Sequence, residues 1–250
     1  MKATWLFFDM GSTIMNETPA MEKRIRDSIA GTDVTYEAFA AKMAEFRAMG
    51  VREDLATFDY FGITKRTPWP RDTEVPYPDA DRVLRTLRER GYRLGIIASQ
   101  PLGSEQRLAR FGLRDYFDVI CASAEEGVDK PDPELFRRAL TRAGCAPEDA
   151  VMIGDRTDND VAPAKSLGMQ TVLIRQGYGG HDTIHHEGEI PDLTVDRMDT
   201  DTVSAVNTHE KILEHFQKEK VPVLIGTQMV AKGLNLPDVT LVGVLDADLS

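Results

Sequence analysis

The stretch "FFDMGSTIMNE", residues 7–17, decides how the rest of the chain is interpreted. An apolar run that is typical of a buried strand ends abruptly at Asp9 and is followed by small polar residues. An aspartate in that position serves as a nucleophile, as a metal ligand or only as a turn former. Gly11 lies two residues later, where a second carboxylate would assist an aspartate that does chemistry.

Apolar strands alternate with helical stretches along most of the chain. The predicted strands are residues 4–8, 93–99, 117–123, 149–155 and 170–175. The predicted helices are residues 79–90, 103–112, 132–144 and 159–168. This alternation predicts parallel βαβ units and an α/β fold built on a doubly wound parallel sheet.

A helical pattern separates the first predicted strand from the second. Apolar residues recur at helix-like spacings over residues 17–61, and the segment 66–78, "RTPWPRDTEVPYP", then breaks any helix with four prolines. We therefore expect a small helical cap insertion at residues 16–77. The sheet domain would then comprise residues 1–15 and 78–196.

Composition and charge limit the class of protein. The chain has 250 residues, 42% of them hydrophobic and 28% charged, as in an ordinary globular protein of one large or two modest domains. The formal net charge of -11 argues against a general affinity for nucleic acid or for an anionic membrane.

The cysteines and the hydropathy pattern bear on the compartment. Cys121 and Cys145 lie 24 residues apart, outside any CxxC spacing, and no signal peptide precedes them. No apolar stretch approaches the roughly 18 residues that a membrane span needs. These features predict a soluble cytoplasmic protein.

Chemically active residues follow four of the predicted strands. They are Asp9 and Thr13, then Ser99, then Lys130 in "GVDKPDP", and finally Asp155, Asp158 and Asp160 in "IGDRTDND". Each one alone is more often a turn former, a helix cap or a solvated side chain. Because the carboxyl ends of parallel strands meet at one edge of a sheet, their ordered recurrence predicts a shared site there.

That order resembles the haloacid dehalogenase superfamily of hydrolases. The segments that carry the resemblance are "FFDMGST", "GIIAS", "DKPDP" and "MIGDRTDND", and the likeness extends over residues 1–196. It implies a Rossmann-like sheet with a helical cap over the site. It also implies a hydrolase, and most directly a phosphatase that acts on a small phosphorylated metabolite.

The resemblance assigns a role to each of these positions. Asp9 would be the nucleophile that forms an aspartyl-phosphate, and Ser99 and Lys130 would hold the transferring phosphoryl group as catalytic and substrate-binding residues. Thr13 would also contact the substrate.

The resemblance also implies a Mg²⁺ cofactor. Its ligands would be Asp9, Asp155 and the backbone carbonyl of Gly11, with Asp160 as a further ligand or orienting group. Carboxylate and carbonyl oxygens are the ligands that this hard cation prefers.

Gly11 departs from the family pattern. In the superfamily the side chain at this position protonates the leaving group and then helps to activate water, a contribution of about 10²–10⁴-fold in rate. A glycine keeps only the backbone carbonyl, which predicts slow turnover of esters with alkoxide leaving groups. A 2-haloacid dehalogenase, which needs neither the acid nor a metal, is the alternative, although "GDRTDND" suits Mg²⁺ better.

The C-terminal segment, residues 197–250, resembles a different family. "LIGTQMVAKG" and "VTLVGVLDAD" are similar to part of the second, RecA-like motor domain of the primosomal replication-restart helicase, primosomal protein N′. The resemblance places Thr227, Gln228, Lys232 and Gly233 in a segment that couples nucleotide state to DNA contacts.

This segment lacks the rest of a helicase motor. The chain contains no GxxxxGK[ST] phosphate-binding loop, and residues 197–250 hold five basic against eight acidic residues, a net charge of -3. We therefore expect neither ATPase activity nor nucleic-acid binding from this chain. A non-catalytic chimera or helicase fragment is a further alternative for the whole protein.

Overall fold

The computed structural model describes residues 3–49, 51, 53–177, 184–198 and 223–226. The chain divides into two compact units, Met1–Thr194 and Val195–Ser250, and each is described by itself. No described helix combines the length and the apolar character needed to cross a lipid bilayer.

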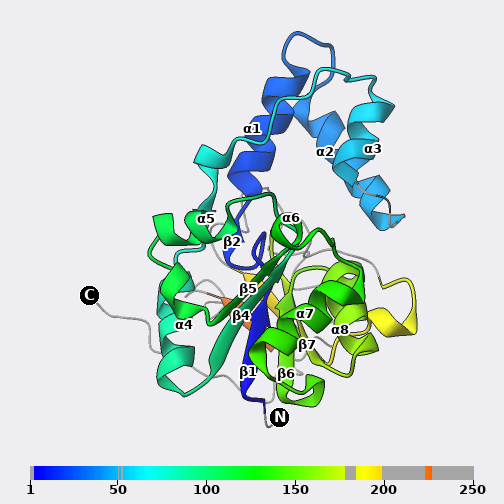
Figure 1. Ribbon diagram of the computed structural model, residues 1–250. Coiled ribbons are helices and arrows are strands. Elements are labelled where there is room, and N and C mark those ends of the chain that lie inside the picture. The colour runs from blue at the N-terminus through cyan, green and yellow to red at the C-terminus, as the bar shows by residue number, and fades with distance from the viewer. Residues whose placement is uncertain (1–2, 50, 52, 178–183, 199–222, 227–250) are drawn as a thin grey trace, which may run out of the picture. The chain divides into compact units, whose positions relative to one another are not determined.

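The first unit is built on a parallel sheet (Figure 1). Its strands are β1 (Trp5–Phe8), β4 (Arg93–Ala98), β5 (Val119–Ala122), β6 (Ala150–Gly154) and β7 (Gln170–Arg175). They lie in the order β5-β4-β1-β6-β7, so β1 is flanked by β4 and β6. The parallel pairing throughout this sheet confirms the predicted α/β fold.

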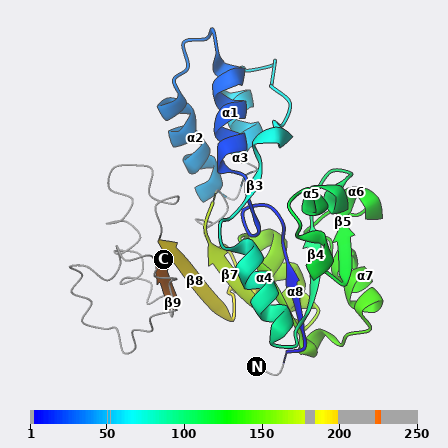
Figure 2. The ribbon, with the colours of Figure 1, turned by 90° about the vertical axis from the view of Figure 1, so that its left-hand side faces the viewer.

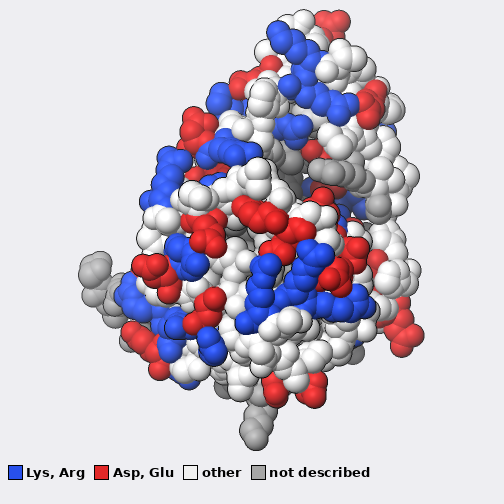
Figure 3. Space-filling model, in the orientation of Figure 1, with Lys and Arg blue, Asp and Glu red and all other residues white. Residues whose placement is uncertain are grey.

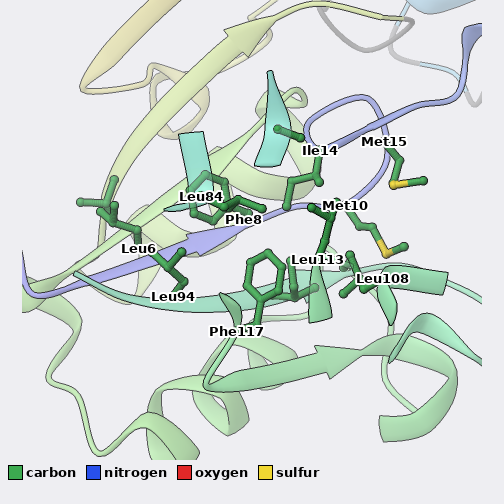
Figure 4. Close-up of a cluster of buried hydrophobic side chains, with 14 residues drawn as sticks. Leu6, Phe8, Met10, Ile14, Met15, Leu84, Leu94, Leu108, Leu113 and Phe117 are labelled. Carbon is green, nitrogen blue, oxygen red and sulfur yellow. The ribbon is translucent and has the colours of Figure 1, made fainter. Parts of the chain in front are cut away.

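Successive residues of β1 point to opposite faces of the sheet and enter separate cores. Leu6 and Phe8 belong to one cluster, with Leu84 of α4 (Ala80–Glu89) and Leu108 of α5 (Ser104–Arg110), and Figure 4 shows their side chains packed together. Trp5 and Phe7 belong to a second cluster on the other face, which includes Leu135, Phe136 and Ala139 of α7 (Pro133–Ala143). This period of two, with apolar residues at every position, is why the strand is buried on both faces.

The helices that cover the sheet follow the predicted pattern with local changes. The α-helices are α4 (Ala80–Glu89), α5 (Ser104–Arg110), α6 (Ser123–Glu126), α7 (Pro133–Ala143) and α8 (Ala162–Ser166). Short 3-10 turns, η1 to η3 and η5, cover Arg71–Thr73, Arg114–Tyr116, Pro147–Asp149 and Glu187–Glu189. The helix predicted at residues 159–168 begins instead as a π-helical turn, η4 (Thr157–Val161), and continues as α8.

The predicted helical insertion is confirmed as three helices that pack together (Figure 2). These are α1 (Thr18–Ile29), α2 (Tyr36–Ala48) and α3 (Glu53–Tyr60). They share their own core of Ile25, Ile29, Phe39, Met43, Phe58 and Ile63. The insertion is joined to the sheet domain through a short antiparallel pair, β2 (Met15–Asn16) with β3 (Val75–Pro76). The domain boundaries at residues 15/16 and 77/78 stay a prediction.

The described part of the second unit is a parallel strand pair. β8 (Leu193–Met198) pairs with β9 (Val223–Gly226), with Val195 opposite Val223 and Met198 opposite Gly226 (Figure 2). Thr227, Gln228, Lys232 and Gly233, which the helicase resemblance singled out, lie outside the described residues.

Candidate active site

Three buried carboxylates meet where two central strands end. Asp9 follows β1, Asp155 follows the neighbouring β6, and Asp160 reaches the same place from the π-helical turn η4. One carboxylate oxygen from each lies within 4.8 Å of the others. Asp9, Asp155 and Asp160 are only 7, 5 and 1% exposed to solvent, respectively. The cluster therefore concentrates negative charge out of contact with solvent.

Lys130 joins two of these carboxylates. Its Nζ lies 2.5 Å from Asp9 Oδ1 and 2.5 Å from Asp160 Oδ1, and the residue is 8% exposed. Burial opposes its charge, but the two carboxylates outweigh that effect and raise the pKa of Lys130. The backbone N–H of Lys130 donates to Ser99 Oγ at 3.0 Å, which places the predicted serine and lysine side by side.

One ammonium group does not balance three carboxylates. Burial first, and then the neighbouring carboxylate of Asp160, raise the pKa of Asp9 to about 6, although Lys130 lowers it. Burial and repulsion from Asp9 and Asp160 raise the pKa of Asp155 well above its ordinary value. A bound divalent cation would remove this repulsion, and an all-oxygen set of carboxylates suits Mg²⁺. The residues therefore fit the predicted cofactor.

Gly154 is a structural requirement of this cluster that the sequence analysis missed. A Cβ atom at this position would lie 2.2 Å from Asp160 Oδ2, so any side chain would displace that carboxylate. The same oxygen accepts a hydrogen bond from the backbone N–H of Arg156 at 3.0 Å. The Gly-Asp pair at the end of β6 is the sequence signal that could have revealed it.

The cluster lies at the wall of a cavity of about 1090 Å³. The sheet domain contributes residues that include Asp9, Ser99, Lys130, Asp155, Asp158 and Asp160, and the insertion contributes Met21, Arg24, Glu53, Asp54, Trp69, Arg71 and Glu74. Arg156 Nη1 lies 3.9 Å from Glu53 Oε2, a contact between the sheet domain and α3. The site is thus enclosed by both parts of the first unit.

Charges around this cavity are mixed rather than of a single sign. Arg24 Nη1 lies 3.0 Å from Asp54 Oδ2, and Arg156 donates to Asp158 at 3.0 and 2.9 Å. Figure 3 shows acidic and basic side chains intermixed on the face that it draws.

The loop after β1 differs in detail from the expectation. Gly11 and Ser12 line the cavity, whereas Thr13 does not. The Thr13 hydroxyl is buried and has no hydrogen-bond partner among the described residues, and the Thr13 backbone oxygen accepts from Gln176 Nε2 at 2.9 Å. Ser12 adopts a left-handed φ of 54°. The substrate role of Thr13 and the metal role of the Gly11 carbonyl stay predictions.

Glu17 is a second residue that the sequence analysis did not select. It lines the cavity, and burial, with repulsion from Asp9 and Glu74, raises the pKa of its carboxyl to about 7. No motif marks this glutamate, because it lies six positions beyond Gly11, where the insertion starts. Only the folding of the loop brings it to the site.

Comparison with known proteins identifies the family. Residues 4–168 match the model of the family described as haloacid dehalogenase-like hydrolase. A glyceraldehyde 3-phosphate phosphatase of Pyrococcus abyssi is 31% identical over 195 residues, covering 69% of this chain and 81% of that protein. The chain belongs to the haloacid dehalogenase-like hydrolases.

Other members of the haloacid dehalogenase-like hydrolases are similarly close. A glyceraldehyde 3-phosphate phosphatase of Methanopyrus kandleri is 39% identical over 123 residues, which is 49% of this chain and 53% of that protein. The chain thus spans about half the length of one relative and four fifths of the other. A crystal structure of a HAD phosphatase from Thermococcus onnurineus has 28% identity and a TM-score of 0.52, covering 78% of this chain and 93% of that one.

The C-terminal part of this haloacid dehalogenase-like hydrolase matches a second family. Residues 181–250 match the model described as helicase conserved C-terminal domain. This bears out the helicase likeness, while the assignment to the primosomal helicase in particular stays a prediction. The match begins at residue 181, before the boundary at residues 196/197 that the sequence analysis placed.

Proposed function

We propose that this chain is a Mg²⁺-dependent phosphatase that hydrolyses a small phosphorylated metabolite through an aspartyl-phosphate on Asp9. The observation that carries the proposal is the buried cluster of three carboxylates joined by Lys130 at the ends of β1 and β6. Nucleophile, cation and candidate metal ligands converge there on one wall of a cavity.

Asp9 has the properties that a nucleophile requires. Its pKa of about 6 is raised by burial but stays below neutrality, so the carboxylate is mostly ionised at pH 7. A carboxylate oxygen of Asp9 attacks phosphorus as the bond to the ester oxygen breaks. Water then attacks the aspartyl-phosphate, which releases phosphate and restores the carboxylate.

The other residues offset charge and orient the phosphoryl group. Mg²⁺ would be held by Asp9, Asp155 and Asp160, with the Gly11 carbonyl. Its positive charge would offset the repulsion between the phosphate dianion and the attacking carboxylate. Lys130 supplies an ammonium beside Asp9, and Ser99 supplies a hydroxyl whose proton is available because its oxygen accepts from Lys130 N.

The substrate class is proposed from the cavity and the relatives. Two relatives are named glyceraldehyde 3-phosphate phosphatase, so a phosphate ester of a short carbon chain is the first candidate. The insertion supplies Met21, Arg24 and Trp69 to the cavity wall and would help to select the group that carries the phosphate.

The dehalogenase alternative is disfavoured by the same cluster. A metal-free displacement at carbon has no use for three buried carboxylates within 4.8 Å. Burial, and then repulsion within the cluster, raise the pKa values of Asp9 and Asp155. Such repulsion is tolerable where a cation binds.

The test is hydrolysis of p-nitrophenyl phosphate and of glyceraldehyde 3-phosphate, with Mg²⁺ and with a chelator. We expect turnover only with Mg²⁺, and none from Asp9→Asn although that variant remains folded. Asp115→Asn, an exposed aspartate outside the cavity, is the matched control and should behave as the wild type. Equal turnover by wild type and Asp9→Asn would refute the assignment.

A further inference from the structure

Glu17 occupies the space that a side chain at position 11 would fill. A Cβ atom placed on Gly11 would lie 2.6 Å from each carboxylate oxygen of Glu17 and 2.7 Å from its Cδ. These three atoms are the nearest neighbours of that position. The carboxyl group that is missing from residue 11 in the sequence is therefore present in space, carried by residue 17.

We propose that Glu17 is the general acid–base of the phosphatase reaction, in place of the side chain that Gly11 lacks. The proposal rests on the phosphatase function proposed above. Glu17 stands at the start of the insertion, and the position of its carboxyl group beside Gly11 is the reason for assigning it a catalytic role.

The loop after β1 folds back to bring Glu17 to this place. The backbone N–H groups of Ile14 and Met15 both donate to Met10 O, at 3.0 and 2.8 Å, and Gly11 forms a bridge with Met15. This tight turn brings the following residues back beside Gly11. Because Gly11 has no side chain, Glu17 can then approach its backbone closely.

The start of α1 leaves the Glu17 side chain available. Glu17 is the N-cap residue of α1, but its side chain makes no capping hydrogen bond. Asn16 Oδ1 accepts instead from the backbone N–H of Thr18 at 3.1 Å. Helix α1 is therefore capped by a neighbour, and the carboxyl of Glu17 lines the cavity.

A short hydrogen-bonded chain orients the Glu17 carboxyl. Gln100 hydrogen-bonds to it, and Gln100 Oε1 in turn accepts from Arg107 Nη2 at 2.8 Å. The hydrogen bond between Gln100 and Glu17 lowers the pKa of Glu17, so the amide N–H₂ of Gln100 is the donor to the carboxylate. Gln100 and Arg107 act as positioning residues on the loop after β4 and on α5.

The role can be written as two balanced proton transfers. In the first step Asp9 bonds to phosphorus, the bond to the ester oxygen breaks, and the Glu17 carboxyl gives its proton to that oxygen, so an alcohol leaves. In the second step the Glu17 carboxylate takes a proton from the attacking water. The bond between Asp9 and phosphorus breaks, phosphate leaves, and both side chains return to their starting state.

Glu17→Gln preserves shape and removes the proton transfer, so the leaving group decides the size of the effect. With glyceraldehyde 3-phosphate, whose leaving group is an alkoxide, we expect kcat/KM to fall by about 10²–10⁴-fold. With p-nitrophenyl phosphate the first step needs little acid catalysis. We therefore expect a rapid burst of one p-nitrophenol per site, followed by slow release of phosphate.

A rescue variant separates catalysis from structure. Glu17→Ala empties the space beside Gly11, and Gly11→Asp in that background returns a carboxyl to it from the other position. We expect the double variant to recover activity on the alkyl ester relative to Glu17→Ala.

The outcomes distinguish this inference from the proposed function. If wild-type turnover requires Mg²⁺ and Asp9, but kcat/KM of Glu17→Gln falls no more on the alkyl ester than on the aryl ester, Glu17 is not the acid–base and only this inference fails. If turnover persists in Asp9→Asn, the phosphatase assignment itself fails. Thermal unfolding of each variant verifies that a loss of activity is not a loss of fold.

Discussion

At the scale of single residues, the surroundings of Asp155 disfavour the negative charge of its own carboxylate. This residue is 5% exposed at the end of β6, and burial and its neighbours Asp9 and Asp160 raise its pKa well above the ordinary value for aspartate. A group whose pKa is higher in the folded than in the unfolded chain stabilises the fold only at low pH. That stability is lost as the pH rises through the folded pKa.

We therefore predict that Asp155→Asn stabilises the metal-free protein. In chelator, wild type and variant should have similar free energies of unfolding at about pH 4, where Asp155 is largely protonated, and the variant should be more stable by about pH 8. Mg²⁺ should stabilise the wild type and have little effect on the variant. Urea unfolding at a series of pH values, with Asp115→Asn as control, measures this. A variant that is less stable than wild type at the higher pH would contradict it.

At the scale of secondary-structure elements, the insertion holds itself together. Phe58 of α3 is fully buried, its ring centroid lies 4.8 Å from that of Phe39 on α2, and the guanidinium of Arg24 on α1 lies 5.2 Å from its centre. One ring thus touches both other helices. The cluster around it is separate from the two clusters that flank the sheet.

Phe58→Ala should loosen the insertion and leave the sheet domain intact. Removing such a ring costs about 3–5 kcal/mol, and here the loss falls on three short helices. We expect faster amide hydrogen exchange across α1, α2 and α3, unchanged exchange in β1 and β6, and weaker turnover of the metabolite. Tyr60→Ala, which removes a ring that is 59% exposed on the same helix, is the control. Uniformly faster exchange across the sheet would show that the insertion is not an independent cluster.

At the scale of the whole molecule, the chain joins two kinds of sequence. The residues that line the cavity run from Asp9 to Asp160, within the first unit and within the match to the hydrolase family. The match to the helicase family covers residues 181–250, and none of the described residues in that range lines the cavity. The residues of the candidate active site and the helicase-like segment thus lie in separate parts of the sequence.

A chain of residues 1–198 should therefore keep the phosphatase activity. It retains every residue that lines the cavity and the whole of β8. We expect Mg²⁺-dependent hydrolysis of p-nitrophenyl phosphate with the kcat and KM of the full chain, measured on the two purified proteins side by side. Loss of turnover in a truncated protein that remains folded would show that the C-terminal segment supports the site.

Much of the site follows from local sequence, because strand ends carry their residues to a common edge. Asp9, Ser99 and Asp155 each stand directly after a strand, and Lys130 lies in the loop after α6, the short helix that follows β5. The parallel sheet brings these positions to one edge. Residue patterns alone also predicted the alternation of strands and helices, the helical insertion and the likeness of the C-terminal segment to a helicase.

Other features depend on contacts that no local pattern encodes. Gly154 leaves room for the Asp160 carboxylate, and Ser12 rather than Thr13 reaches the cavity. Above all, the sequence shows Gly11 as a missing acid, while the turn after β1 returns Glu17 to the same space. The sequence alone determined the strands and the strand-end residues that meet in the candidate site. The tertiary structure decided which side chains share a volume, because that depends on how a loop folds back on itself.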